Sequence, residues 1–292
     1  MENGHPAVRQ LRYLPPVGAA YGVEVLSFAA LRETDTERRR TRLQRPDFHV
    51  LALITGGSGA HEADFRHHEL HEGSVVWIRP GTVHRWSDVE HLDGPLVLFQ
   101  PGFLPDPALE AREATSPACW RLPPELLRLA APAADHLGHE HRAAVRCPRL
   151  ASSAVLSHLL AALLLRLLPG TSAPPAPGAP AGRQWGIFHA YRAEVEEHFP
   201  HRHRVADYAR ALGYDVRTLT RATRAATGHG AKTFLDQRIL LEAKRLLAHS
   251  GLPVGTCAHR LGFADAGNFT TFFRCRTGLA PTAWAAALHQ TP

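Results

Sequence analysis

The 292-residue sequence is poor in lysine and cysteine and has no long hydrophobic run. Two of its 33 basic residues are lysines, so arginine supplies nearly all of the positive charge. The cysteines show no CxxC or CxxH spacing, and we interpret them as reduced thiols outside any zinc or disulfide-exchange motif; they are Cys119, Cys147, Cys257 and Cys275. No segment reaches the roughly 18 uncharged apolar residues of a membrane span, and the N-terminus lacks a signal-peptide core. The sequence therefore predicts a cytoplasmic protein without a membrane partner.

The positive charge is concentrated in the C-terminal part of the chain. The composition, 45% hydrophobic, is that of a folded protein, and the length allows two domains of ordinary size. Residues 1–183 hold 19 basic and 19 acidic residues, whereas residues 184–292 hold 14 and 8. A basic region attracts a polyanion such as double-stranded DNA, because binding releases counterions from the phosphates. The alternative is a charge excess that only keeps the protein soluble.

A segment rich in proline, alanine and glycine, residues 169–183, is the clearest domain boundary. We interpret it as a linker between domains 1–168 and 184–292. The first domain contains four strand-like segments separated by glycine-rich turns, which predict a β-barrel or double-sheet core; they are VEVLSFAAL, FHVLALITG, SVVWIRPG and PLVLFQPG. Helical patterns at 122–129 and 149–168 predict helices laid against this core.

The second of those helices carries a stripe of leucines at spacings of three and four. A stripe of this kind has to be buried. It packs either on its own domain or against the same helix of a second subunit, and the sequence leaves both interpretations open. The leucines are Leu156, Leu159, Leu160, Leu163, Leu164 and Leu167.

Residues 205–284 contain an internal repeat, with copies at 205–228 and 254–278. Each copy has a small residue, a leucine and a glycine at matching spacings, then an aromatic residue, an aspartate and an apolar anchor. The glycine can end one helix in a left-handed conformation and the aspartate can cap the next. Each copy therefore predicts two short crossing helices, the second of which can enter a major groove. The matched pairs are Ala209/Ala258, Leu212/Leu261, Gly213/Gly262, Tyr214/Phe263, Asp215/Asp265 and Leu219/Phe269.

The segment between the two copies, residues 234–249, has the apolar spacing of a helix. At 1.5 Å per residue such a helix is about 24 Å long. It could hold two reading helices near one turn of DNA, about 34 Å, apart.

These features carry a resemblance to a known family. Residues 188–287 resemble the DNA-binding domain of the AraC family of bacterial regulators. The resemblance implies an α+β protein of two domains: a cupin-like β-barrel with helices of its own, then an all-α domain of two helix-turn-helix units joined by a linker helix. It implies a sequence-specific transcription regulator, activator or repressor. The family's closing pattern is matched by Gly262, Phe263, Phe269, Phe273, Arg274, Gly278 and Pro281.

The resemblance assigns DNA contacts to both units, with a solvated helix face as the alternative for the arginines. Thr223, Ala266 and Gly267 depart from the family pattern, as does Thr271, where the family often has arginine. We therefore expect base reading mainly from the first unit and positioning from the second. The first unit contributes Arg217, Thr218, Thr220, Arg221 and Arg224. The second contributes Asn268, Thr270, Thr271 and Arg274.

The N-terminal domain contains GSVVWIRPGTVHRW, residues 73–86, which resembles the second cupin motif. The resemblance implies a small effector inside the barrel. We expect convergent polar groups and an aromatic wall to contact it; these candidates are Arg45, His49, His84 and Trp86. For His84, a structural hydrogen bond is the alternative.

A histidine-rich stretch at 61–71 offers plausible metal ligands. The cupin metal motif needs an H-x-H pair followed by a glutamate at fixed spacing, and no such pair is present. We predict no metal or other cofactor, and several of these histidines on an exposed strand or turn. The stretch contains His61, His67, His68 and His71, followed by Glu72.

The leading hypothesis is a regulator that is not an enzyme and has no catalytic residues. A small-molecule effector in the barrel changes how the DNA-binding domain is presented. We expect a homodimer, with RNA polymerase as a further partner to consider. One alternative is a metal-dependent cupin enzyme with an accessory DNA-binding tail. Another is an effector-independent regulator whose barrel serves only for dimerisation.

Overall fold

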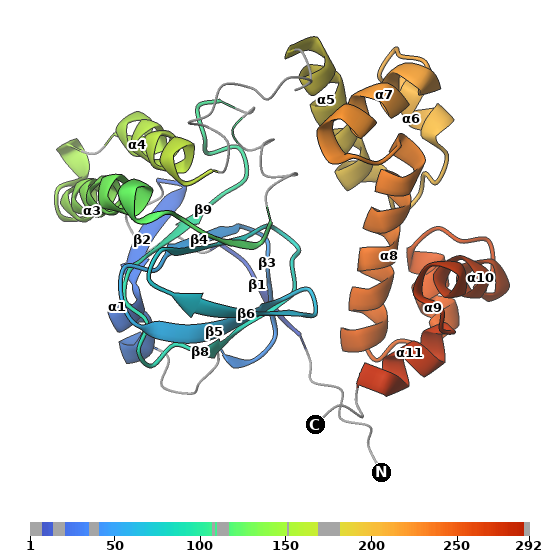
Figure 1. Ribbon diagram of the computed structural model, residues 1–292, viewed down its shortest axis with the longest axis horizontal. Helices are drawn as coiled ribbons and strands as arrows, with labels where there is room; N and C mark the ends of the chain where they lie inside the picture. Colours follow the sequence, from blue (N-terminus) through green and yellow to red (C-terminus); the bar gives the residue numbers. More distant parts are fainter. Residues whose placement is uncertain are drawn as a thin grey trace. The chain divides into compact units, whose positions relative to one another are not determined.

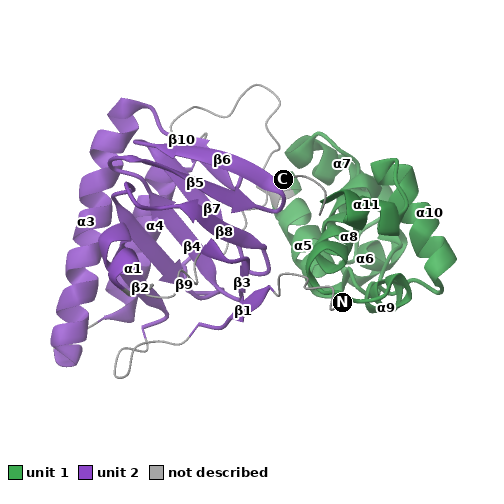
Figure 2. Ribbon diagram, turned by 90° about the horizontal axis from the view of Figure 1, so that it is seen from below, with its two compact units in different colours: residues 1–7, 175–292 green, residues 8–174 purple. Residues whose placement is uncertain are grey.

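The computed structural model describes residues 8–13, 21–34, 41–106, 109, 117–150, 152–168 and 182–288. The chain divides into two compact units, coloured separately in Figure 2, one formed by residues 8–174 and one containing residues 175–292. Sheets and helices build the first unit, and the described part of the second is helical. The predicted two-domain α+β fold is confirmed. Residues 169–181 of the predicted linker lie outside the described residues, and the boundaries at 168 and 184 stay predictions.

Two five-stranded sheets form the first unit. Their neighbouring strands are antiparallel except for the parallel pair β1 and β3. Sheet A has the order β1 (Arg9–Leu11), β3 (Gln44–Pro46), β8 (His84–Asp88), β5 (Ser58–Ala63) and β6 (Arg66–His71). Sheet B has the order β10 (Cys119–Arg121), β7 (Ser74–Ile78), β4 (His49–Leu53), β9 (Pro95–Phe99) and β2 (Val23–Ser27).

The central strands of sheet B are buried on both faces. In β4, Val50 and Ala52 join a core with residues of sheet A, whereas Leu51 and Leu53 join a second core with residues of two helices. Side chains alternate between the faces of a strand, so a strand covered on both sides needs apolar residues at every position. This explains why FHVLALITG and SVVWIRPG are nearly continuous apolar runs.

The two helices that cover the outer face of sheet B are α3 (Pro124–Arg146) and α4 (Ser153–Leu167) (Figure 1). The helix predicted at 122–129 begins at Pro124 and continues much further than expected, to Arg146. The second helix starts four residues later than expected, where the Ser152 hydroxyl caps it by accepting the N–H of Val155.

The leucine stripe of α4 is buried in this same core. Five of its members are fully buried and Leu159 is half-buried, packed against residues of α3 and sheet B. The stripe therefore packs on its own domain, and a dimer would have to use other side chains.

The predicted strand VEVLSFAAL was wrong in its second half. Only Val23–Ser27 is a strand, and α1 (Phe28–Thr34) follows directly. The Ser27 hydroxyl accepts the N–H of Ala30, which caps the helix. Phe28 and Leu31, three residues apart, are both buried, so one face of a short helix satisfies them better than an alternating strand.

The second unit contains seven described helices. Figure 1 shows α8 running between the first group, α5 to α7, and the last group, α9 to α11. The helices are α5 (Gly182–His198), α6 (Val205–Ala211), α7 (Val216–Thr227), α8 (Ala231–His249), α9 (Val254–Arg260), α10 (Ala266–Thr277) and α11 (Pro281–Leu288). The predicted linker helix begins three residues earlier than expected, at Ala231.

The internal repeat folds as two helix-turn-helix units, α6–α7 and α9–α10. Asp215 and Asp265 cap their second helices, accepting backbone N–H groups at 2.6 and 2.7 Å. The turn glycines Gly213 and Gly262 have φ angles of 69° and 72°, which favour glycine. The predicted pair of crossed helices is confirmed in both copies. No helix in the described ranges is both long and apolar enough to span a membrane.

Candidate functional site

The outer surface of α7 carries three exposed arginines at spacings of four and three: Arg217, Arg221 and Arg224. Among the residues that the structure describes, none of their guanidinium groups forms an ion pair or a hydrogen bond, and Arg221 is close enough to interact electrostatically with the exposed Asp215. Thr220 is half-buried beside them. The arrangement leaves three guanidinium groups available on one helix surface, where each could make a bidentate contact to a guanine or a phosphate.

The corresponding surface of α10 carries mostly small, uncharged side chains. Ala266, Gly267 and Thr271 are exposed, and Thr270 is half-buried. Arg274 in the last turn is exposed, and the described residues provide no ion-pair partner for it. The surface of α10 therefore offers close approach and one cation rather than a row of guanidinium groups.

Two of the predicted contact residues are occupied by helix capping. Thr218 donates its hydroxyl to the Asp215 carboxylate at 3.1 Å, and the Asn268 amide donates to Asp265 at 2.8 Å. The backbone N–H of Thr218, followed by its hydroxyl, lowers the pKa of Asp215 below its ordinary value. In this structure Thr218 and Asn268 hold the start of each helix.

Different side chains support the two reading helices. Leu219 and Thr223 lie buried on the inner face of α7, and the Thr223 hydroxyl donates a hydrogen bond to the Leu219 carbonyl at 2.7 Å. The inner face of α10 is aromatic: Phe269 packs on Phe263 and on Phe273, with ring centroids 5.3 and 5.9 Å apart. Aromatic pairs add to the burial of apolar area, so the inner face of α10 is bulkier than that of α7.

In the barrel unit, the structure brings His84 and Trp86 together with His61, a residue outside the predicted effector set. His61 on β5 lies opposite Trp86 on β8, and their rings are 4.5 Å apart. The Nε2 atom of His61 lies 3.1 Å from the Nδ1 atom of His84. Gln44, directly opposite His84 on β3, is buried too. These residues form a polar patch, Gln44, His61 and His84, on the inner face of sheet A.

The histidine pair is uncharged at neutral pH. Burial lowers the pKa of His84 to about 4, and burial, followed by the neighbouring His84, lowers the pKa of His61 well below its ordinary value. The Nδ1 atom of His61 and the Nε2 atom of His84 are buried, and neither has a hydrogen-bond partner among the described residues. In a neutral pair, one ring donates to the other. The two outer nitrogens then present one N–H donor and one lone-pair acceptor, whichever tautomers are present.

Sequence reasoning could have found His61 through strand alternation. In HEADF, His61 and Ala63 point to one side of β5, and Glu62 points to the other, where it pairs with Arg85. The His-rich stretch was interpreted by composition instead.

His49 and Arg45 do not join the polar patch. His49 belongs to the opposite face of sheet B, where its ring stacks on Phe99 at 4.5 Å and accepts a hydrogen bond from the Trp77 indole at 3.3 Å. Trp77 and Phe99 are part of the core shared with α3 and α4. Arg45 is half-buried on β3, next to the inward-facing Gln44. The structure therefore groups two of the four predicted effector residues and separates the other two.

The remaining histidines of the 61–71 stretch lie on β6. His67 and His71 are exposed and His68 is half-buried. Among the described residues, the group that brings three potential metal ligands close together lies elsewhere, on α5: Glu194, Glu197 and His198. There Glu194 already forms ion pairs with His198 and with Arg202.

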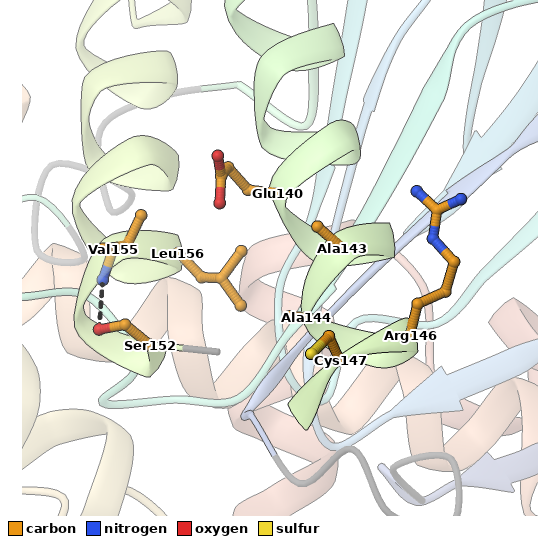
Figure 3. Close-up of a pocket in the computed structure, with 8 residues that line it drawn as sticks. All are labelled: Glu140, Ala143, Ala144, Arg146, Cys147, Ser152, Val155 and Leu156. Atoms are coloured by element: carbon orange, nitrogen blue, oxygen red, sulfur yellow. Dashed lines mark hydrogen bonds between the residues drawn. The ribbon is translucent and has the colours of Figure 1, made fainter. Parts of the chain in front are cut away.

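A pocket of about 380 Å³ lies between the end of α3 and the start of α4 (Figure 3). In this view Leu156 points toward α3 and Glu140 toward α4. No lining residue has an unpartnered buried polar atom among the described residues. The pocket offers volume but few fixed polar contacts; its lining residues are Glu140, Ala143, Ala144, Arg146, Cys147, Ser152, Val155 and Leu156.

Comparison with known proteins matches both units to family models. Residues 25–168 match an AraC-like ligand binding domain, and residues 208–287 match a helix-turn-helix domain. The curated relatives include the HTH-type transcriptional activator RhaS of Salmonella schwarzengrund (strain CVM19633), 26% identical over 246 residues, which cover 80% of this chain and 84% of that protein. RhaS of Salmonella paratyphi A (strain ATCC 9150 / SARB42) is 25% identical over 244 residues, with the same coverage.

Two solved structures illustrate the range of structural matches. ToxT from Vibrio cholerae O395 aligns over 92% of this chain and 98% of its own, with 10% identity and a TM-score of 0.37. The DNA-binding domain of AdpA in complex with a target DNA aligns over 35% of this chain and 92% of its own, with 28% identity and a TM-score of 0.32.

The two units and their family models define a transcription regulator in which a ligand-binding barrel domain precedes a double helix-turn-helix domain. The chain belongs to the AraC family. It is a DNA-binding regulator that responds to an effector.

Proposed function

We propose that α7 reads base pairs in one major groove while α10 positions the protein in the next. Arg217 and Arg221 would contact base edges, with Thr220 between them, and Arg224 would reach phosphate. On α10, Arg274 would contact phosphate, and Thr270 and Thr271 would approach the backbone.

One observation carries this proposal: arginines of the C-terminal compact unit differ in whether they pair with a carboxylate. Arg238, Arg245 and Arg276 form ion pairs with carboxylates inside the unit. Arg217, Arg224 and Arg274 have no carboxylate partner among the described residues, and Arg221 has only an electrostatic interaction with the exposed Asp215. Cations gathered on one surface attract a polyanion, and the phosphate backbone of DNA is such an anion.

The test is the binding of the full-length protein to duplexes selected from a random-sequence library. We expect enrichment of a defined sequence and an affinity that falls steeply as the salt concentration rises, because bound phosphates release counterions. Affinity for duplex DNA no greater than that of an acidic control protein at low salt would refute the proposal.

For the effector we propose the polar patch inside the barrel, Gln44, His61 and His84, with Trp86 as its aromatic wall. Leaving an outer nitrogen of a buried imidazole unpaired costs about 1–3 kcal/mol, so these atoms favour a ligand that pairs with both. One donor and one acceptor suit an uncharged hydroxyl or amide group. The pocket between α3 and α4 is the competing location.

Two variants distinguish these locations. We expect His84→Phe to abolish stabilisation of the protein by an effector found in a thermal-shift screen of sugars, polyols and amides. Ala143→Trp, which fills the helix pocket, should leave that stabilisation unchanged. The reverse pattern would place the effector between the helices.

We also propose that the barrel senses rather than catalyses. Stoichiometric iron, manganese, nickel or zinc in the purified protein, bound by His61 and His84, would contradict this role and support a metal-dependent cupin enzyme.

We propose a homodimer formed through the outer surfaces of α3 and α4. Four exposed large apolar side chains lie on these helices: Leu129, Val145, Val155 and Leu165. Exposed apolar side chains on these helices are candidates for burial in an interface between subunits. Sedimentation should show a dimer for the native protein and a monomer for Val155→Asp; a native monomer at micromolar concentration would refute the proposal.

We propose RNA polymerase as a further partner if the protein activates transcription. Recruitment of purified polymerase to the DNA-bound protein tests this proposal.

A further inference from the structure

Asp236 is a buried acid at the middle of the double helix-turn-helix unit. Its side chain is 9% exposed, and both carboxylate oxygens are used. One oxygen accepts a hydrogen bond from the Lys232 ammonium group at 2.6 Å, and the other accepts one from the Arg276 guanidinium group at 2.6 Å. Both contacts have the length of strong charge-assisted hydrogen bonds.

The two partners of Asp236 belong to different halves of the unit. Lys232 is one turn before Asp236 on α8 and also donates to the backbone carbonyl of His203, just before α6. Arg276 is in the last turn of α10 and lies over the Phe272 ring, 3.9 Å from its centroid. The carboxylate therefore links the start of the first helix-turn-helix unit to the reading helix of the second.

The same region holds two further contacts between the halves. A Cβ atom at Gly262, in the turn of the second unit, would lie 2.2 Å from the carbonyl oxygen of Pro200. The rings of His203 and Phe263 are 4.7 Å apart. These are mainly backbone and ring contacts, and His203 is also hydrogen-bonded to the backbone of Leu261, whereas the two bonds of Asp236 are charge-assisted.

A buried carboxylate is not the most stabilising side chain for such a position. Removing it from water costs several kcal/mol, and a well-packed apolar residue would often give equal or greater stability. What the charged link adds is a fixed geometry, because each bond requires its partner in one direction. We propose that Asp236 is a positioning residue that fixes the orientation of α10 relative to α7, and with it the spacing of the two DNA half-sites.

This inference rests on the proposed contact of both reading helices with one duplex. When two linked contacts match their spacing, the second forms at a high effective concentration, and this advantage is lost when the geometry is wrong. Losing the Asp236 link should therefore weaken binding to a two-half-site duplex without changing the contacts that α7 makes on its own.

The experiment compares Asp236→Asn with the native full-length protein on three duplexes derived from a selected site. These are the two half-sites at native spacing, the same site with one inserted base pair, and the α7 half-site alone. For Asp236→Asn we expect affinity to fall about tenfold or more at native spacing and to stay unchanged on the half-site. The loss caused by the inserted base pair should shrink relative to the native protein.

Two further variants keep the test decisive. Arg276→Gln should reproduce the spacing effect, and combining it with Asp236→Asn should add little, because both remove one link. Glu196→Gln is the matched control: it breaks the exposed ion pair between Glu196 on α5 and Arg238 on α8, which does not touch α10. It should change none of the three affinities. If Asp236→Asn does not fold, Arg276→Gln provides the readout.

Equal losses on the half-site and on the full site would overturn the positioning role, and so would an unchanged response to the inserted base pair in both variants. Native protein that binds the half-site and the full site equally well would instead contradict the proposed use of both helices.

Discussion

The two helix-turn-helix units share one backbone plan and differ in what they show to solvent. Both have an aspartate cap, a turn glycine of positive φ and a left-handed glycine at the end of the second helix. On the outer surface, α7 carries three arginines that form no ion pair within the described ranges, whereas α10 carries small residues and Arg274. The residues that shape the backbone are therefore kept in both copies, while the residues available for contact have diverged.

On their inner faces, by contrast, it is α10 that carries the larger side chains. The core of the second unit is built from phenylalanines that touch one another and Trp284, whereas α7 buries a leucine and a threonine. The helix with the bulkier inner face has fewer arginines on its outer surface. The comparison agrees with the proposed division of work, in which the second unit positions the protein and the first one discriminates between base pairs.

The largest expected effect comes from removing the aromatic anchor. Phe269→Ala should destabilise the C-terminal unit by about 3–5 kcal/mol, more than Leu219→Ala at the matching position, for which we expect about 2–4 kcal/mol. Both side chains are fully buried. Chemical denaturation of the two variants measures the difference; a larger loss for Leu219→Ala would reverse the comparison of the cores.

The turn glycines provide a matched pair with an intermediate effect. Alanine at Gly213 meets no atom within 4 Å, so only its positive φ opposes the change, at about 1 kcal/mol. Alanine at Gly262 would also collide with the Pro200 carbonyl, and we expect a total loss of about 2–4 kcal/mol. Equal losses in thermal unfolding would show that the close approach at Gly262 has no energetic consequence.

On the DNA side, Arg217→Ala should cost about 1–3 kcal/mol on the selected site and relax the preference at one base pair. Arg274→Ala should weaken binding to all sequences alike. Titration of each variant with specific and random duplexes measures both effects, and Arg210→Ala, which removes an exposed cation from α6, is the control. Parallel losses on both duplexes for both variants would remove the distinction between reading and positioning.

The smallest effect is expected at the caps. Asp215→Ala and Asp265→Ala each remove one capping carboxylate, so both should lower the unfolding temperature slightly and by similar amounts. A clear inequality would show that the two units do not share the same local plan. Asp→Asn at the same positions keeps a capping oxygen and should recover most of the loss.

The repeat was predictable from sequence because its signals are local. Glycine at a positive φ and aspartate three residues before a free N–H act within one turn of chain, so their spacing alone predicts the crossed helices. The resemblance to the AraC family extended the same signals to the whole domain.

The candidate effector site, the polar patch, was only partly predictable, because strand partners are set by the sheet and not by sequence distance. His84 and Trp86 were identified, but His61 becomes their neighbour only through the pairing of β5 with β8. That His49 lies on the other face of sheet B could not be predicted for a related reason: β4 is buried on both faces, so its composition does not show which face looks into the barrel. The helix α1 was missed because the Ser27 cap interrupts a run that otherwise has strand composition.

The central claim, that the first unit reads bases and the second positions the protein, is tested most directly by a single-base substitution scan of the selected site. The account predicts that sensitive positions, each costing about 1–3 kcal/mol, cluster in the half-site that α7 covers, while the other half shows backbone protection without base preference. Equal base sensitivity in both halves, or sensitivity confined to the α10 half-site, would contradict it.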